Sequence, residues 1–347
     1  MQRRLRSLSP IAVFAAAAVV VAVLPAFVSD FRAQQFAYVG IYTVALIGLN
    51  ILTGYTGQIS LGHGAFMAIG GYTTAILMAD HGWKDVYTIP VAAVVAGAAG
   101  FLFGLPALRL TGLYLALATF GIAVALPAVI KKYEGFTGGG QGINLFGRPE
   151  LTASVTPVEV LGVELNFNNW LYALSWTVAL VMYVIAWLVL RGPTGRAFRA
   201  VRDSETAAVS SGISLARYKT LAFGISAAYA GVAGSLFAIA TTFVNPDTFP
   251  IALSIFLLVG VVVGGLGALA GLVVGAIVIE FLPIWAQGEG IGSYLPDFIV
   301  EQTKKPGAPA VVYGLVLILL MFVLPNGVSG LLRRIGALTG RRSSGSN

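Results

Sequence analysis

The chain has 347 residues, of which 57% are hydrophobic and only 10% are charged, and its mean hydropathy is +0.87. Because this small share of polar residues cannot cover the surface of a water-soluble globule, the composition predicts a multi-pass membrane protein. The net charge of +7 is scattered along the chain, which argues against a nucleic-acid partner, and the absence of cysteine excludes disulfides and thiolate metal sites.

A membrane-spanning helix needs about 20 apolar residues, and the sequence offers roughly ten such stretches. The predicted fold class is therefore all-α, with about ten transmembrane helices in one transmembrane domain over residues 1–347. The eighth stretch is short, and we expect it to be a half-helix paired with the ninth. The expected spans are 10–28, 36–53, 60–79, 88–107, 112–130, 170–190, 218–242, 251–264, 268–285 and 310–325.

The distribution of Lys and Arg predicts the orientation, because cytoplasmic loops retain these residues. With the N-terminus inside, fourteen of the twenty-one Lys and Arg lie on the inner side and eleven of the fourteen acidic residues lie outside. Both termini are then cytoplasmic, with an outer loop at 131–169 and a cytosolic tail at 333–347. The inner cations are Arg3, Arg4, Arg6, Arg109, Arg191, Arg196, Arg199, Arg202, Arg217, Lys219, Arg333, Arg334, Arg341 and Arg342.

The first apolar stretch can also be read as a cleaved secretory signal, because a basic start precedes an apolar run. The run from Ile11 to Val28 is longer than the core of a typical signal, and no clear A-x-A cleavage site follows it. We therefore expect an uncleaved first span.

The segment from Asn50 to Met78 departs from a plain hydrophobic helix, because it combines six glycines with Gln58, Ser60 and His63 at the membrane boundary. Irregular backbone at that depth is tolerated only where it is buried in protein or lines a watery path. Two readings stay open. The segment is either a tight turn between helices or the wall of a gate or pathway.

The glycine-rich stretch from Phe136 to Ile143, FTGGGQGI, opens the outer loop. It lacks the Lys-Ser or Lys-Thr of a phosphate-binding loop and is expected outside, so nucleotide binding is not predicted. We expect flexible, exposed backbone that a soluble partner could contact.

The segment 191–219 carries six of the Lys and Arg residues between two apolar stretches and is patterned like a soluble helix pair. Arg196, Arg199 and Arg202 recur at helical spacing and share one face. This predicts a compact, shaped surface in the cytosol. The residues that define the second helix are Asp203 or Ser204 as its cap, Glu205 in its first turn and Gly212 at its end.

Five glycines between Val259 and Glu280 follow the small-xxx-small spacing of closely packed membrane helices. The run Gly265–Ala270 imitates a dinucleotide fingerprint but lacks the strand context, so we interpret it as a packing motif. Glu280 is the acidic residue that falls within a predicted span. It is either functional or simply hydrogen-bonded near a helix end.

Six blocks in this order resemble the permease subunits of bacterial ABC importers for branched-chain amino acids, of the LivM type. The resemblance covers most of the chain, roughly residues 36–325, and the order and spacing of the blocks make it specific. The blocks are GYTGQISLGHGAFMAIGGY (Gly54 to Tyr72), TFGIA (Thr119 to Ala123), TGGGQGI (Thr137 to Ile143), GRAFRAVRDSETAAVSSGI (Gly195 to Ile213), YKTLAFGISAAYAGVAGSL (Tyr218 to Leu236) and VVVGGLGALAGLVVGA (Val261 to Ala276).

The resemblance implies a transmembrane permease in the cell inner membrane that works with a second homologous permease subunit, two cytosolic ABC ATPase subunits and an extracytoplasmic substrate-binding protein. ATP would be used by the ATPase partners, so no cofactor and no enzymatic activity are expected in this chain. Membrane lipid would contact the remaining surface.

By the same resemblance, Gly195–Ile213 would seat in a cleft of the ATPase. The arginines would donate charge-assisted hydrogen bonds to the ATPase, and Phe198 and Val201 would fill an apolar socket there. The alternative is that the arginines only hold the loop inside and contact lipid headgroups. The expected coupling residues are Arg196, Phe198, Arg199, Val201, Arg202, Asp203, Glu205, Ala208 and Gly212.

A route for apolar amino acids should be mostly apolar and should bind its cargo only weakly. Residues that we expect along this route are Gln58, Ser60, His63, Thr119 and Glu280. For His63, a hydrogen-bonding strut is preferred over a pH-sensitive gate.

Three other functions compete with the importer. A related importer for urea or short amides shares these motifs, and an ATP-independent channel or secondary carrier would work without ATPases. The shaped cytosolic loop and the lone intramembrane acid speak against the channel or carrier. A membrane-embedded enzyme lacks chemistry here, because the chain has no cysteine, only His63 and His81, and no carboxylate pair in its spans.

Overall fold

The computed structural model describes most of the chain between residues 29 and 286. The expected first span (10–28), most of the tenth (310–325) and the tail (333–347) lie outside the described residues. Within the described part, six helices are long and apolar enough to cross a membrane, so the count of ten spans stays a prediction. The described residues are 29–108, 110, 112–153, 157–160, 163–286, 314–315, 318–319, 322 and 327–330.

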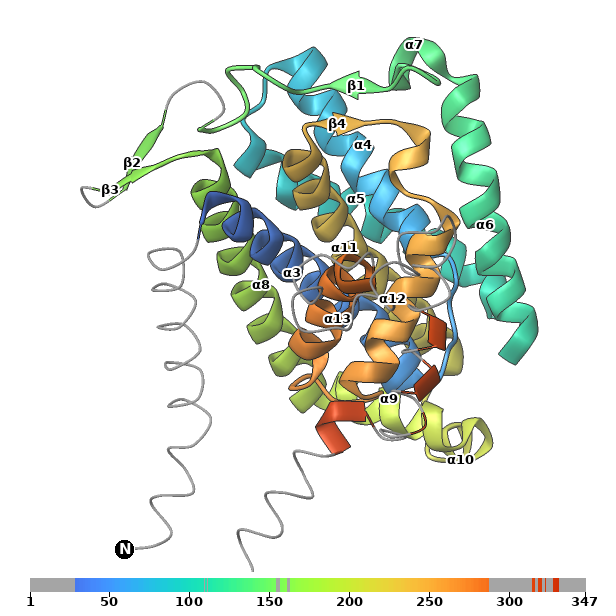
Figure 1. Cartoon of the computed structure of the whole chain (residues 1–347). Coiled ribbons are helices and arrows are strands. Elements are labelled where there is room, and N and C mark those ends of the chain that lie inside the picture. The colour runs from blue at the N-terminus through green and yellow to red at the C-terminus, as the bar shows by residue number, and fades with distance from the viewer. Residues whose placement is uncertain are drawn as a thin grey trace, which may run out of the picture.

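Three helices form the centre of the bundle: α3 (Asp30–Asn50), α4 (His63–His81) and α11 (Leu215–Thr241). Around them, α5 (Asp85–Ala107) lies along α11, and α8 (Phe167–Arg191) lies along α3 (Figure 1). Most of α3 and α11 is buried, whereas α5 and α8 expose apolar side chains. An exposed apolar face on a helix of this length is what a lipid environment requires.

Glycines allow α4 and α11 to approach until their backbones touch. A Cβ atom on Gly70 would overlap the backbone of Gly231, and one on Gly234 would overlap the backbone of Met67. At this close approach Thr74 of α4 donates a 2.6 Å hydrogen bond to Ser235 of α11. Small residues and an interhelical hydroxyl bond are the usual means of helix association in membranes, where no hydrophobic effect separates helix from lipid.

The sequence predicts a half-helix at 251–264 paired with the next apolar stretch, and α12 (Ile251–Gly264) and α13 (Leu272–Ala286) do pack against each other. The turn 265–271 joins them. Together with the preceding turn, α12 belongs to a 19-residue apolar segment, Pro246–Gly264, that is long enough to cross a membrane, so its half-helix character stays a prediction. The predicted packing glycines lie at their contact: a Cβ on Gly264 would lie 2.9 Å from the Gly271 carbonyl oxygen, and Gly275 packs against the Gly260 backbone.

One end of the bundle carries the strands β1 (Ile143–Asn144) and β4 (Phe243–Val244) and is called the strand end here. The sequence predicts only helices, so these strands are a departure from the prediction. These strands pair antiparallel, and β2 (Val158–Val160) pairs with β3 (Val163–Leu165). Each strand has only two or three residues, too few for a periodic pattern to register. The all-α prediction therefore holds for the bundle but not for the loops of this end.

The glycine-rich stretch at the strand end is largely exposed, as expected, and it is also hydrogen-bonded to its neighbours. After α7 (Glu134–Thr137), the hydroxyl of Thr137 donates to the Ile130 carbonyl at 2.7 Å. Gly142 has φ +72°, and a Cβ there would overlap the Val244 carbonyl of β4. Asp85, which is fully buried, receives hydrogen bonds from the backbone and hydroxyl of Thr152. These contacts hold the glycine-rich stretch and Thr152 to the bundle.

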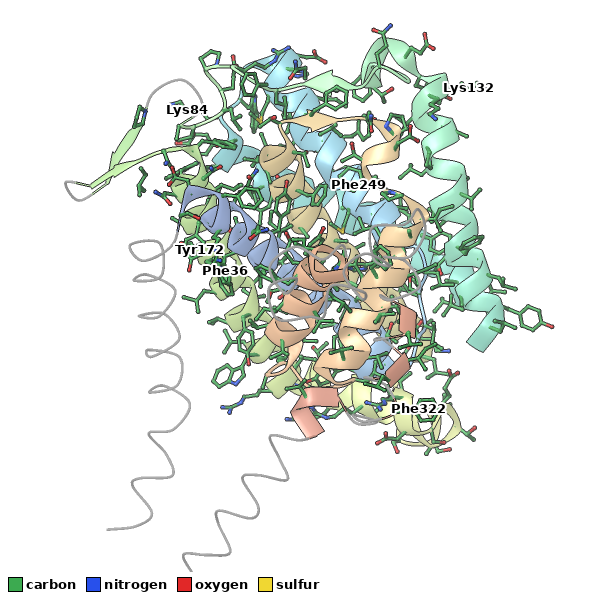
Figure 2. All side chains as sticks on the ribbon, viewed as in Figure 1. Phe36, Lys84, Lys132, Tyr172, Phe249 and Phe322 are labelled. Carbon is green, nitrogen blue, oxygen red and sulfur yellow. The ribbon has the colours of Figure 1, made fainter. Side chains whose placement is uncertain are left out.

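The remaining long helix, α6 (Gly112–Lys132), lies at the side of the bundle and ends at the strand end (Figure 1). Figure 2 shows Lys84 and Lys132 at that same end, opposite α9 (Pro193–Asp203) and α10 (Glu205–Ser210). The 3-10 turn η3 (Pro246–Thr248) joins α6 through an ion pair of Lys131 with Asp247 at 3.6 Å.

Replacing Gly70 with Val should lower the thermal stability of the purified chain, because the backbone of Gly231 cannot yield to a side chain. Overpacking of this kind costs roughly 1–3 kcal/mol. The matched control is Gly121→Val in α6, where a Cβ meets no heavy atom of the described residues within 4 Å. Thermal unfolding in detergent measures both. Equal melting temperatures for the two variants would contradict the close α4–α11 contact.

Candidate functional site

The candidate site begins where α8 turns into α9. Gly192 is extended, and Pro193 occupies the first turn of α9, where its missing N–H costs nothing. A Cβ on Gly195 would overlap the backbone of Leu190, so α9 starts directly against the last turn of α8. At this corner the guanidinium of Arg191 lies 3.8 Å from the centre of the Trp187 ring. The corner is thus short and tightly packed.

The inner face of α9 is part of the core of this chain. Phe198 and Val201 are 0% and 2% exposed, and Phe198 meets Tyr218 of α11 edge-on at 6.3 Å between ring centres. The prediction that these two side chains fill an apolar socket on a partner is therefore wrong. They anchor α9 to α8 and α11, because burying an apolar side chain in its own bundle removes it from any partner surface.

The second helix begins and ends as the sequence predicts. Ser204, the alternative to Asp203, accepts a hydrogen bond from the Ala207 N–H at 3.2 Å, and Gly212 follows α10 with φ +78°. Glu205 forms a 2.7 Å ion pair with Lys219, a side chain of α11 that is only 6% exposed. Because a buried ammonium needs a partner, this pair fixes α10 to α11.

The outer face of α9 carries the three arginines. Arg196, Arg199 and Arg202 are all exposed, as is Asp203, while Ala208 of α10 is buried. Two of the arginines also contact the bundle: Arg199 donates to the Leu190 carbonyl at 3.4 Å, and Arg202 donates to the Gly54 carbonyl. The pair of helices therefore presents a cationic face to solvent and is held on its other face by the membrane bundle.

Four of the predicted pathway residues come together where the chain passes from α3 to α4. Gln58 and Ser60 are buried; Gln58 donates to the Thr56 hydroxyl at 2.9 Å, and Ser60 accepts from the Gly62 N–H at 3.3 Å. Each side chain thus makes a hydrogen bond inside this chain. The segment is therefore a hydrogen-bonded turn in this state, and its role as a pathway wall stays a prediction.

His63 and Thr119 hold this turn to the neighbouring helices. His63 is 1% exposed, and its Nε2 lies 3.0 Å from the Ala45 carbonyl of α3, the strut geometry that was preferred for it. Thr119 of α6 accepts from the Leu61 N–H at 2.9 Å. Since a Cβ on Gly62 would lie 2.6 Å from the Thr119 carbonyl oxygen, the turn and α6 are in close contact.

Glu280 lies apart from the other pathway candidates. It belongs to α13, is half-buried, and lies near Tyr38 of α3. Tyr38 is about two helical turns from Ala45, to which His63 binds, so roughly 10 Å of helix separate the two contacts. The structure does not bring Glu280 into the group around Ser60.

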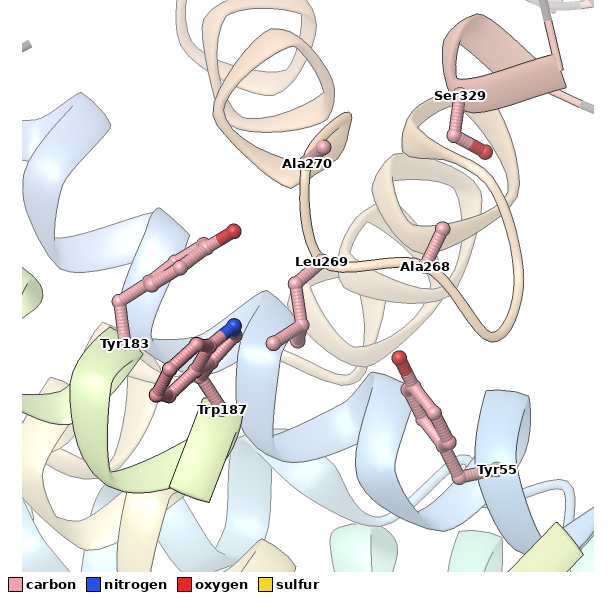
Figure 3. A pocket seen from close by; sticks show the side chains of 7 residues that line it. All are labelled: Tyr55, Tyr183, Trp187, Ala268, Leu269, Ala270 and Ser329. Atoms are coloured by element: carbon pink, nitrogen blue, oxygen red, sulfur yellow. The ribbon is translucent and has the colours of Figure 1, made fainter. Parts of the chain in front are cut away.

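An open pocket of about 470 Å³ lies beside the corner between α8 and α9. Figure 3 shows Tyr183 and Trp187 of α8 on one side and Leu269 pointing toward Trp187 from the α12–α13 turn. Sequence reasoning missed this group, because its members come from four separate segments. The pocket is lined by Tyr55, Tyr183, Trp187, Ala268, Leu269, Ala270 and Ser329.

These features define a class of protein: a multi-pass membrane bundle with a cationic helix pair fixed at one end and the packed helices α12 and α13 beside it. The family described as "branched-chain amino acid transport system / permease component" matches residues 31–324. The chain belongs to this family. A comparison with solved structures gives no match.

Several curated relatives are similar. The high-affinity branched-chain amino acid transport system permease protein LivM of Escherichia coli K12 is 39% identical over 255 residues, 69% of this chain and 60% of LivM. The permease protein LivH of the same system is 28% identical over 83% of this chain and 91% of LivH. The autoinducer 2 import system permease protein LsrC of Enterobacter sp. strain 638 is 27% identical over 84% of this chain and 76% of LsrC.

Replacing Phe198 with Ala should destabilise the chain purified without any partner, because the ring is buried within the chain itself. A large-to-small change of this kind costs roughly 3–5 kcal/mol. Val209→Ala is the control, since Val209 is 55% exposed on α10. If thermal unfolding gave Phe198→Ala the stability of the parent chain, the ring would not be part of this core.

Proposed function

We propose that this chain is the permease subunit of an ATP-driven importer that moves branched-chain, hydrophobic amino acids across the cell inner membrane. The observation that carries the proposal is the cationic helix pair α9–α10, which is exposed on one face and fixed to the bundle on the other. Membership of the permease family supports it, as do the names of LivM and LivH. A channel or carrier needs no such shaped element.

The proposed partners are two cytosolic ATPases, a second permease subunit and an extracytoplasmic binding protein. Similarity to both LivM and LivH supports a pair of homologous permeases, because those two names belong to one transport system. The ATPases would bind the exposed side of α9–α10, where Arg196 and Arg199 can donate charge-assisted hydrogen bonds to carboxylates. The binding protein would meet the strand end.

The chain's own contacts indicate how movement of the ATPases would reach the membrane. Phe198 ties α9 to α11, the Gly195–Leu190 contact ties it to α8, and the ion pair of Glu205 with Lys219 ties α10 to α11. A displacement of the helix pair therefore pulls on two spanning helices at once. In the proposed cycle this switches the route from one side of the membrane to the other, which is alternating access.

The cargo is proposed from the family. A route that carries apolar side chains should offer apolar walls and only weak binding, because a tight site would slow release. Gln58, Ser60, His63, Thr119 and Glu280 remain the candidates for its polar positions. The hydrogen bonds that the first four of these residues make within the chain indicate that they shape the route more than they hold cargo.

Uptake by the complex reconstituted in vesicles tests this function. Leucine should enter only when ATP and the binding protein are both present, and Arg199→Glu should reduce ATPase co-purification and uptake by at least tenfold, because it reverses a charge at the contact. The control is Arg32→Glu, an exposed arginine in the first turn of α3, which should leave both unchanged. Uptake without ATPases would establish a channel or carrier instead.

The proposed orientation places both termini and α9–α10 in the cytosol. A reporter that is active only in the cytosol, fused after Gly340, should therefore be active. Fusion after Phe146, which lies at the strand end, should be inactive and serves as the control. An inactive reporter after Gly340 together with an active reporter after Phe146 would mean that the orientation in the membrane is the reverse of the proposed one.

A further inference from the structure

Asn50 is a fully buried amide at the inner end of α3 that reaches a segment more than 200 residues away. Its side-chain nitrogen donates to the Ala268 carbonyl at 2.9 Å, and its side-chain oxygen accepts from the Gly267 N–H at 2.9 Å. Both bonds go to the turn that joins α12 and α13. One side chain thus satisfies a donor and an acceptor of the same turn, whose residues Gly267 and Ala268 are partly buried.

Arg202 of α9 contacts the segment that directly follows Asn50. After Asn50 the helix continues as a single π-helical turn, η2 (Ile51–Tyr55), whose widened hydrogen-bond pattern is a frequent feature of functional sites. The carbonyl of Gly54 in this turn accepts from the guanidinium of Arg202. A cation at this position is also stabilised by the negative end of the helix dipole.

Two glycines make this convergence possible. A Cβ on Gly54 would overlap the side-chain oxygen of Asn50 and the backbone nitrogen of Gly267. Gly267 has φ +74°, and a Cβ there would lie 2.6 Å from Nη1 of Arg202. Three segments, the end of α3, the α12–α13 turn and α9, therefore meet without any intervening side chain.

We propose that Asn50 is a positioning residue of the transport cycle, which makes the α12–α13 turn move together with α9. The inference rests on the proposed function. Movement of α9 is carried by Arg202 to Gly54, and Asn50, one turn earlier, carries it to Gly267 and Ala268. Ala268 to Ala270 line the pocket opposite Trp187, so the width of this pocket follows the position of α9 (Figure 3).

The chain is well suited to a direct test because it contains no cysteine. Tyr183→Cys and Ala270→Cys place two spin labels on opposite sides of the pocket, in a complex whose partners lack accessible cysteine. The distance between the labels should differ between the nucleotide-free and the ATP-trapped complex. Asn50→Leu, which removes both hydrogen bonds at similar volume, should abolish this difference and reduce uptake at least tenfold while ATP hydrolysis continues.

The matched control is Thr43→Ala. Thr43 is also a buried polar side chain of α3, but its hydroxyl donates to the Val39 carbonyl of the same helix at 2.8 Å. It should keep the ATP-dependent distance change. If Asn50→Leu fails to assemble, Asn50→Asp replaces it. This variant keeps an oxygen that can accept from the Gly267 N–H, but at high pH its carboxylate has no donor for the Ala268 carbonyl. The ATP-dependent change in the distance between the labels should then be smaller than in the parent complex.

The outcomes separate the two proposals. If the parent complex takes up leucine and Asn50→Leu keeps both uptake and the distance change, the role of Asn50 is refuted and the importer stands. An unaltered distance in the parent complex on ATP binding also refutes it. If the parent complex takes up no amino acid with its ATPases bound, the proposed function itself fails.

Discussion

The structure depends on one constraint: backbone that leaves the helical pattern inside an apolar bundle must find every hydrogen-bond partner within the protein. The chain meets it between α3 and α4, where the π-helical turn η2 is followed by residues 57–62, which lie outside any helix. Thr53 and Thr56 donate to backbone carbonyls, and Thr119 accepts from the Leu61 N–H. Ser254 of α12 accepts from the first turn of α4 at 2.9 Å. Polar side chains from three helices thus converge on one turn.

This constraint explains why the polar residues of the turn lie inward and why its neighbours are glycines. Each side-chain hydroxyl or amide that satisfies the backbone must approach closely, and a Cβ on Gly62 or Gly64 would lie under 3.0 Å from its neighbour. The turn is therefore held together by its own hydrogen bonds and connected to α6 and α12 by single hydrogen bonds. Such connections can exchange partners between two states, whereas a packed apolar interface would have to be rebuilt.

Much of the site could be predicted from sequence where the signal is local. The spacing of three arginines, the cap at Ser204 and the stop at Gly212 predicted the helix pair, and the glycine spacing predicted the α12–α13 contact. The inward direction of Phe198 could not be predicted, because an amphipathic pattern does not distinguish the chain's own core from a partner's socket. The role of Asn50 was also hidden. Its partners are 217 and 218 residues away, and no local pattern reports such a contact.

Arg202 has two roles, one in the orientation of the chain in the membrane and one in a specific contact between helices. In the proposed orientation it is one of the cations that keep the loop in the cytosol, a role that any lysine or arginine in this loop could fill. Its contact with the Gly54 carbonyl is more demanding, because the planar guanidinium must fit beside Gly267, where no side chain is tolerated. The orientation signal is therefore redundant among the arginines, whereas the mechanical contact belongs to Arg202. Counting charges along the sequence detects the role of Arg202 in orientation, but it does not detect the contact of Arg202 with the Gly54 carbonyl.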